Sequence, residues 1–136
     1  MDVAELNSHR PDKAAHVFAR CCGSTVWVDR MVAARPYRDT TAVLTTAEEV
    51  WWDLSAEDWQ EAFAANIVTP AASSHPEYEE TFGHPYVVFV VDQSAEDLDV
   101  TYRRRLGNDL VSELSEAAAE QARITNRALR LLLEVS

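Results

Sequence analysis

Apolar residues recur every three or four positions over most of the chain, which is the spacing of one face of an α-helix. The longest such pattern runs from Asn108, interpreted as an N-cap, to about Leu133. Shorter patterns predict helices from Asp12, also as an N-cap, to Gly23 at the C′ position, from Trp27 to Arg35-Pro36, and from Thr41 to Leu54. Residues 1–136 are therefore predicted to form one domain, a mostly helical bundle.

Two identical start signals stand in the middle of the chain. Ser55-Ala56-Glu57-Asp58 and Ser94-Ala95-Glu96-Asp97 each place a hydroxyl residue first and acids in the opening turn, where they suit the helix dipole. Ser74-His75-Pro76-Glu77 is similar, and predicts a short helix that ends at Phe82-Gly83.

Two stretches break the helical pattern. Residues 66–74 contain small residues and a proline and are interpreted as a loop. Residues 86–91 are a continuous apolar run, which periodicity alone assigns to a buried strand. Because no partner strand is evident, we expect an extended segment threaded between helices.

Charge and composition exclude several classes of function. The formal net charge of −11 opposes binding to a phosphate backbone, so nucleic acid is not expected as a partner. No apolar run approaches the roughly 20 residues that cross a bilayer, and the acidic N-terminus does not resemble a secretory signal. We therefore expect a cytoplasmic protein that does not bind membranes.

The cysteines and tryptophans are interpreted as structural. Cys21 and Cys22 are adjacent, which does not suit a mutual disulfide, and they lack the partners of a zinc site. We expect reduced thiols packed at a helix end, and no metal. The four tryptophans are expected in the core or at an interface rather than around a ligand.

Three stretches carry residue patterns in a fixed order. They are Cys21-Cys22-Gly23-Ser24 with Trp27, Met31 and Arg35-Pro36-Tyr37; Asp58-Trp59 with Glu61-Ala62-Phe63-Ala64-Ala65; and Tyr78, Phe82-Gly83, the apolar run to Val91, Arg105-Leu106-Gly107-Asn108 and Glu113. Together they resemble the 2-oxo-4-hydroxy-4-carboxy-5-ureidoimidazoline (OHCU) decarboxylases of urate breakdown. The resemblance implies an all-helical homodimer that acts on a small molecule without metal or organic cofactor.

The chain departs from the family where the chemistry is expected. In the family, the helix that ends Ala-Phe-Ala-Ala leads into a His-Pro dipeptide, whose histidine is the proposed acid–base group. Asn66 stands at that position, and an amide cannot exchange a proton near neutral pH. A family helix with an adjacent Glu-Gln pair, which contacts the substrate ring, is expected to be deleted between Asn66 and Tyr78.

The resemblance also implies which binding groups remain. Arg105 matches a family arginine that contacts the anionic or carbonyl edge of the substrate, and a guanidinium can bind both oxygens of a carboxylate. The backbone of Pro85, Tyr86, Val87 and Val88 matches a family segment that holds the ring. Two interpretations of Arg105 remain open, one in the substrate pocket and one on the surface or in a structural ion pair.

Two histidines are candidates to replace the missing acid–base group. His75 precedes Pro76 and is either part of a helix start or a relocated catalytic residue. His84 precedes the apolar run, close to the expected pocket wall. We list His75, His84 and Arg105 as candidate catalytic residues, and Asn66, Arg105 and the segment from Pro85 to Val88 as candidate substrate-binding residues.

These residues support three hypotheses. The first is a diverged, cofactor-free enzyme of specialised biosynthesis, which acts on a small cyclic or carboxylate-bearing metabolite by decarboxylase or cyclase chemistry. The second is a catalytically inactive binding or partner protein on the same scaffold. The third is an authentic OHCU decarboxylase of purine catabolism, which requires His75 or His84 near the end of the helix that contains Trp59.

Overall fold

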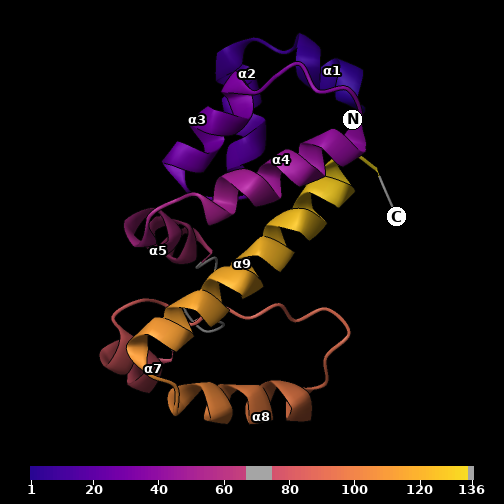
Figure 1. Ribbon diagram of the computed structural model, residues 1–136. Helices are drawn as coiled ribbons and strands as arrows, with labels where there is room; N and C mark the ends of the chain where they lie inside the picture. The colour runs from indigo at the N-terminus through magenta and orange to yellow at the C-terminus, as the bar shows by residue number, and fades with distance from the viewer. Residues whose placement is uncertain (67–74, 135–136) are drawn as a thin grey trace.

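The computed structural model of the protein describes residues 1–66 and 75–134, and every regular element among them is a helix (Figure 1). The all-α prediction is thereby confirmed. The helices are α1 (Val3–Ser8), α2 (Pro11–Ala19), α3 (Thr25–Ala33), α4 (Thr40–Trp52), α5 (Ala56–Ala65), α7 (Pro76–Phe82), α8 (Ala95–Leu106) and α9 (Leu110–Leu132).

The long helix α9 is the spine of the molecule. It crosses the molecule from α7 and α8 at one end to α4 and the N-terminus at the other (Figure 1). The Trp51 indole N–H on α4 donates to the carbonyl of Ala118 on α9 at 2.9 Å. Trp27 on α3 donates in turn to Ala47 on α4 at 3.2 Å. Buried indoles thus join three helices through apolar contact and a satisfied N–H.

The sequence predicted the two capping boxes correctly. The side chains of Ser55 and Ser94 each accept a hydrogen bond from the backbone amide three residues ahead. The carboxylates of Asp58 and Asp97 accept in turn from the backbone amides of the two serines. The predicted end of α7 is also confirmed, because Gly83 takes the left-handed conformation with φ 79°.

Three other helix ends differ from the prediction. The N-cap of α2 is Arg10, because Pro11 occupies the first helical position and moves Asp12 into the first turn. The N-cap of α9 is Asp109, whose carboxylate accepts from the Ser112 amide at 2.7 Å, and not Asn108. His75 is the N-cap of α7 and makes no side-chain cap bond. Ser74 and the predicted loop over 67–74 lie outside the described residues.

Gly23 has a different role from the one predicted. It does not adopt a positive φ, so it is not a left-handed helix end. Instead, a Cβ added at Gly23 would lie 2.2 Å from the Cβ of Ala65 on α5. Glycine is required here because it lets the chain after α2 approach α5 closely.

The two cysteines lie at a helix end as reduced, packed thiols, as the sequence predicted. Cys21 and Cys22 are free and buried just after α2, and burial raises the pKa of both to about 11.

Of the four tryptophans, Trp27 and Trp51 are in the core, whereas Trp52 is 43% exposed. Among the described residues, no helix is long and apolar enough to cross a membrane.

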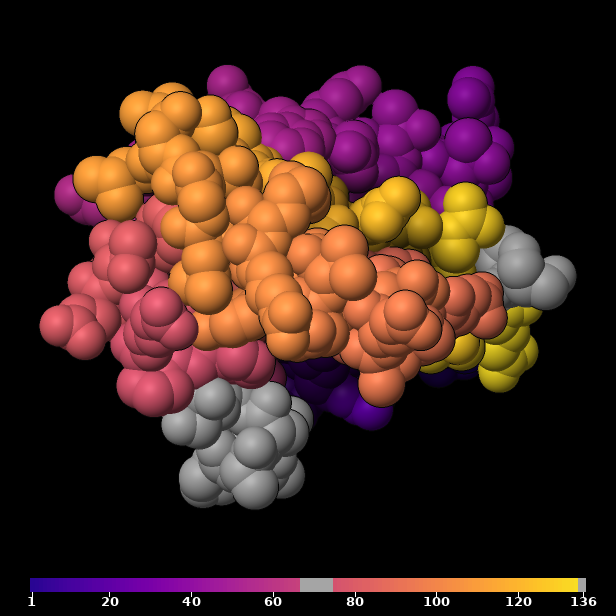
Figure 2. Space-filling view, turned by 90° about the horizontal axis from the view of Figure 1, so that it is seen from below, coloured from indigo at the N-terminus to yellow at the C-terminus, as the bar shows by residue number. Residues whose placement is uncertain are grey.

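Residues 85–90 are neither helix nor strand, which confirms the threaded segment predicted from the apolar run. Val87 is buried in the hydrophobic core, and the amide of Phe89 donates to Glu120 on α9 at 3.1 Å. Figure 2 shows the molecule from below, where α7, this segment and α8 form the surface beside α9. The segment therefore closes one end of the molecule and brings its main chain to α9.

Candidate functional site

Arg105 near the end of α8 is completely buried and fully engaged by the protein. Its Nε lies 3.1 and 3.0 Å from the two carboxylate oxygens of Glu113, and its Nη2 lies 2.5 Å from one of them. Its Nη1 donates to the carbonyl of Val87 at 2.6 Å. One side chain therefore joins α8, α9 and the extended segment.

Glu113 is also completely buried and accepts further hydrogen bonds. The hydroxyl of Tyr78 donates to it, and the Asn108 amide donates at 3.1 Å. Burial is the largest cause that raises the pKa of Tyr78, and the hydrogen bond from its hydroxyl to the Glu113 carboxylate is the second. Burial acts to lower the pKa of Arg105, but its bonds to Glu113 outweigh that effect and the pKa is raised. The guanidinium of Arg105 is thus held in its charged form.

This geometry bears on the two interpretations of Arg105. The Tyr86 ring covers the guanidinium, with 4.4 Å between the ring centroid and Cζ, and Glu113 occupies the edge that would bind a carboxylate. A ligand would have to displace Glu113 and leave it buried without its counter-ion. In this structure Arg105 is therefore a buried ion-pair residue, and its catalytic and substrate-binding roles stay predictions.

His75 is the N-cap residue of α7, but its ring packs into an aromatic cluster and makes no cap bond. Its ring centroid is 4.9 Å from that of Tyr86 and 5.0 Å from that of Tyr102. Its Nδ1 is buried and has no hydrogen-bond partner in the part of the chain that the structure describes. His75 therefore packs against the ring of Tyr86, which also contacts Arg105.

His84 lies closer to the end of α5. Its ring is 5.2 Å from that of Phe63, which stands one turn before Asn66, and 5.6 Å from that of Tyr78. The side chain is only 6% exposed. Its Nδ1 is 3.0 Å from the carbonyl of Pro85, which favours Nδ1 as the protonated nitrogen and leaves Nε2 as the basic one.

Asn66 is the C-cap of α5, and its side chain faces α9. Its amide nitrogen donates to the side-chain oxygen of Gln121, and Gln121 donates to the Thr125 hydroxyl at 3.1 Å. Gln121 is completely buried. Asn66, at the position that the resemblance assigns to the family histidine, is thus part of a short chain of hydrogen bonds between neutral side chains. These side chains do not transfer protons at neutral pH.

The main chain from Pro85 to Val88 is partly used by the protein itself. The Pro85 carbonyl is taken by His84 and the Val87 carbonyl by Arg105. Among the described residues, the amides of Tyr86 and Val88 have no hydrogen-bond partner. Hydrogen bonding of these two N–H groups to a substrate ring stays a prediction.

The structure thus gathers the predicted residues around one end of the molecule, with His75, Tyr86 and Arg105 in contact and His84 beside α5. Sequence reasoning did not identify Gln121 as the partner of Asn66. Gln121 stood on the apolar face of the last helix, and a polar residue on such a face is a signal that a buried partner is needed. Among the described residues, no group of His, Cys, Asp and Glu side chains is arranged as metal ligands.

Comparisons with known proteins agree on the fold and the family. The family model described as OHCU decarboxylase matches residues 7–66 and 71–131. A crystal structure of an OHCU decarboxylase in the presence of (S)-allantoin is similar, with a TM-score of 0.75, 22% identity, and coverage of 93% of this chain and 99% of that one. A crystal structure of (S)-allantoin synthase is also similar, with a TM-score of 0.72, 15% identity, and coverage of 99% of this chain and 54% of that one. A comparison with curated protein sequences found no match. Because the family model covers most of the sequence, the chain belongs to the OHCU decarboxylase family.

Proposed function

We propose that this chain is a diverged enzyme of the family, which acts on a small cyclic, carboxylate-bearing metabolite at the C-terminal end of α5. The observation that carries the proposal is the position of His84, whose ring contacts Phe63 one turn before Asn66. Family membership supports decarboxylase-like chemistry. An imidazole beside α5 supports proton transfer there, although Asn66 itself cannot supply it.

The groups around His84 fit the requirements of such a reaction. Loss of carbon dioxide from a ring leaves a carbanion that must be stabilised and then protonated on one face. The free amides of Tyr86 and Val88 are suited to a ring carbonyl or its developing oxyanion, and His84 Nε2 is suited to carry the proton. Asn66, held by Gln121, is suited to orient the substrate.

His84→Gln tests the proposal, because glutamine keeps hydrogen bonding but cannot transfer a proton near neutral pH. His16→Gln is the matched control, since His16 is an exposed histidine on α2. Activity would be measured with freshly generated OHCU, following optically active allantoin by circular dichroism, and with a panel of ring carboxylates, following carbon dioxide release. We expect activity on at least one of these substrates and a loss of about 10²- to 10⁴-fold in His84→Gln alone.

The outcomes separate the three hypotheses. Rapid turnover of OHCU that depends on His84 would identify an authentic OHCU decarboxylase, and turnover of another ring carboxylate would identify a repurposed enzyme. Activity that survives His84→Gln in a variant with an unchanged melting temperature would refute the role of His84. No turnover of any substrate by folded protein would refute the enzyme proposal.

A specific observation favours the second candidate, a catalytically inactive binding protein. Asn66 bonds to Gln121 and Arg105 bonds to Glu113, so the polar side chains at these two family positions each have a partner within the protein. A binding protein would retain ligand affinity without turnover, which calorimetry with the same ring carboxylates would detect. In either case we expect a cytoplasmic homodimer, which light scattering and cell fractionation would test.

A further inference from the structure

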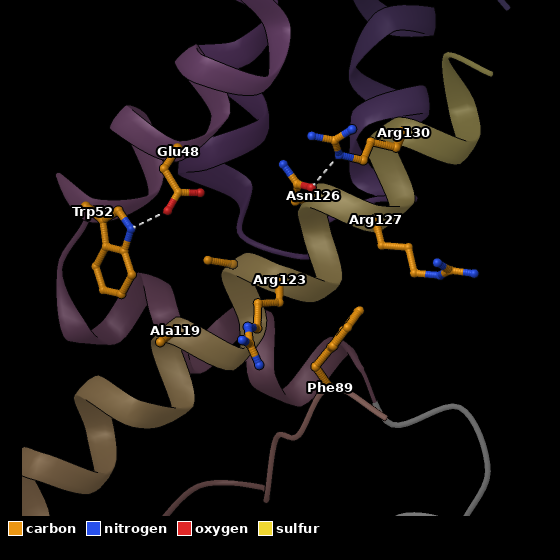
Figure 3. A pocket seen from close by; sticks show the side chains of 9 residues that line it. Glu48, Trp52, Phe89, Ala119, Arg123, Asn126, Arg127 and Arg130 are labelled. Carbon is orange, nitrogen blue, oxygen red and sulfur yellow. Dashed lines mark hydrogen bonds between the residues drawn. The ribbon is translucent and has the colours of Figure 1, made fainter. Parts of the chain in front are cut away.

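A groove runs along the side of α9 that faces α4 and the extended segment (Figure 3). Its volume is about 520 Å³, within the range of small-molecule sites. Its lining combines aromatic walls, a floor of small residues and several arginines: Glu48, Trp52, Phe89, Ala119, Ala122, Arg123, Asn126, Arg127 and Arg130. No catalytic or binding role described above uses these side chains.

The groove is positive in a protein that is strongly negative. Three arginines and one glutamate line it, which gives the groove a net charge of +2, whereas the whole chain carries −11. Arg123, Arg127 and Arg130 are spaced so that they share one face of α9. A local positive potential of this kind attracts anions that the rest of the surface repels.

Within the part of the chain that the structure describes, two of these arginines have no carboxylate partner. Arg123 lies 3.5 Å from Glu120, but Arg130 donates only to the neutral side chain of Asn126, at 2.8 Å. Arg127 forms no ion pair within residues 1–66 and 75–134. The helix dipole favours a cation such as Arg130 in the last turn, but it does not account for a cationic groove with aromatic walls.

The aromatic walls are held in place. Trp52 remains 43% exposed, yet its indole N–H donates to Glu48 at 2.9 Å, which fixes the ring at the edge of the groove. On the other side, the ring of Phe89 lies 6.0 Å from the guanidinium carbon of Arg123. Between them, Ala119 and Ala122 form a low floor on α9. A flat apolar body fits such a space better than a compact hydrated ion.

The groove is separate from the site proposed at the end of α5. Gln121, which contacts Asn66, lies about 180° around α9 from Arg130 at 100° per residue. A neighbouring hollow beyond Phe89 is less suited to anions, because Glu116 and Glu120 line it with Arg104 and Arg123. The positive, aromatic side of α9 toward α4 is therefore a distinct feature.

We propose that this groove binds a planar aromatic carboxylate, whose ring packs between Trp52 and Phe89 and whose acidic groups pair with Arg127 and Arg130. A guanidinium binds a carboxylate through two parallel hydrogen bonds and also stacks on aromatic faces, so the lining matches both parts of such a ligand. Because it concerns binding on the opposite face of α9, the proposal does not depend on catalysis at His84.

The test is calorimetric titration of the full chain with naphthalene-2,6-dicarboxylate. We expect saturable one-site binding, with a Kd of about 0.1 mM or lower that weakens as salt is added. The uncharged 2-naphthamide should bind at least about tenfold more weakly, because it cannot form charge-assisted bonds. The double variant Arg127→Gln/Arg130→Gln should weaken binding of the dicarboxylate by about ten- to a hundredfold.

Two further variants make the result specific. Arg38→Gln is the matched control, since Arg38 is 89% exposed and distant in sequence from the groove, and it should leave the Kd unchanged. Trp52→Leu should weaken binding of the dicarboxylate while the melting temperature stays close to that of the wild type. Equal binding of the amide, equal binding by the double variant, or no binding to any folded form would each overturn the proposal. A change of oligomeric mass in the double variant without loss of probe binding would also overturn it, because the groove would then be an interface between copies.

Discussion

The buried pair of Arg105 and Glu113 allows a quantitative prediction for Glu113→Gln. The substitution keeps the shape of residue 113 but removes its charge, so the buried guanidinium of Arg105 loses its hydrogen-bonded counter-ion and keeps only Glu116, whose carboxylate lies 3.8 Å from its Nε. Removing one partner of a buried pair typically costs about 3–5 kcal/mol. Against a total stability of about 5–15 kcal/mol for a domain, such a loss is a large fraction.

The assay is equilibrium unfolding in urea at pH 7. With a slope of about 1–3 kcal/mol per molar urea, the expected loss lowers the midpoint by at least about 1 M. Arg105→Met alone should also be costly, because the carboxylate of Glu113 is then unpaired. The double variant should lose at least about 2 kcal/mol less than the sum of the single variants, because the two charges are coupled.

The control is the exposed pair of Asp99 and Arg103 on α8, with 3.1 Å between Oδ2 of Asp99 and Nε of Arg103. Asp99→Asn removes the same kind of charge in solvent and should cost no more than about 1 kcal/mol. If Glu113→Gln costs as little as Asp99→Asn, or if the double variant shows no coupling, the ion pair does not hold this end of the molecule together and the reasoning fails.

Three further predictions concern packing, capping and pH. Gly23→Ala should destabilise the protein by about 1–3 kcal/mol in urea unfolding, because its Cβ would overlap that of Ala65, and Ala65→Gly in the same chain should recover part of the loss. Ser94→Ala should cost about 1 kcal/mol by thermal unfolding, because it removes the N-cap of α8. Burial raises the pKa of Cys21 and Cys22 from 9.0 to about 11, so the folded state holds these protons longer than the unfolded state. Their contribution to stability is complete below pH 9 and is lost as the pH rises toward 11, and the free energy of unfolding should therefore fall less steeply over that range in Cys21→Ala/Cys22→Ala.

The fold was largely predictable because its signals are local. A serine followed three residues later by an acid specifies a helix start through contacts within one turn, and both Ser55 and Ser94 confirm this. The errors arose where a neighbouring residue shifts the start of a helix. Pro11 takes the first helical position, so that Arg10 and not Asp12 is the N-cap of α2, and Asp109 caps α9 in place of Asn108.

The site was less predictable because its properties depend on partners that are distant in the chain. Nothing local distinguishes Arg105 from its neighbours Arg103 and Arg104, yet only Arg105 is buried and faces Glu113. The contact of His84 with Phe63 joins residues that are separated by the segment over 67–74. Position along the chain placed both residues near one end of the molecule, but it could not show which of them is available to a ligand.

The ion pair also restricts how this sequence can change over time. The Val87 carbonyl, the Tyr78 hydroxyl and the Asn108 amide all depend on the charges of Arg105 and Glu113 for their hydrogen bonds. A single change to either charged residue leaves the other buried without its main partner, whereas replacing both by well-packed apolar residues often leaves stability unchanged. Sequence drift at these two positions is therefore expected to occur by paired exchange, so that a relative with only one of them changed would carry compensating changes nearby.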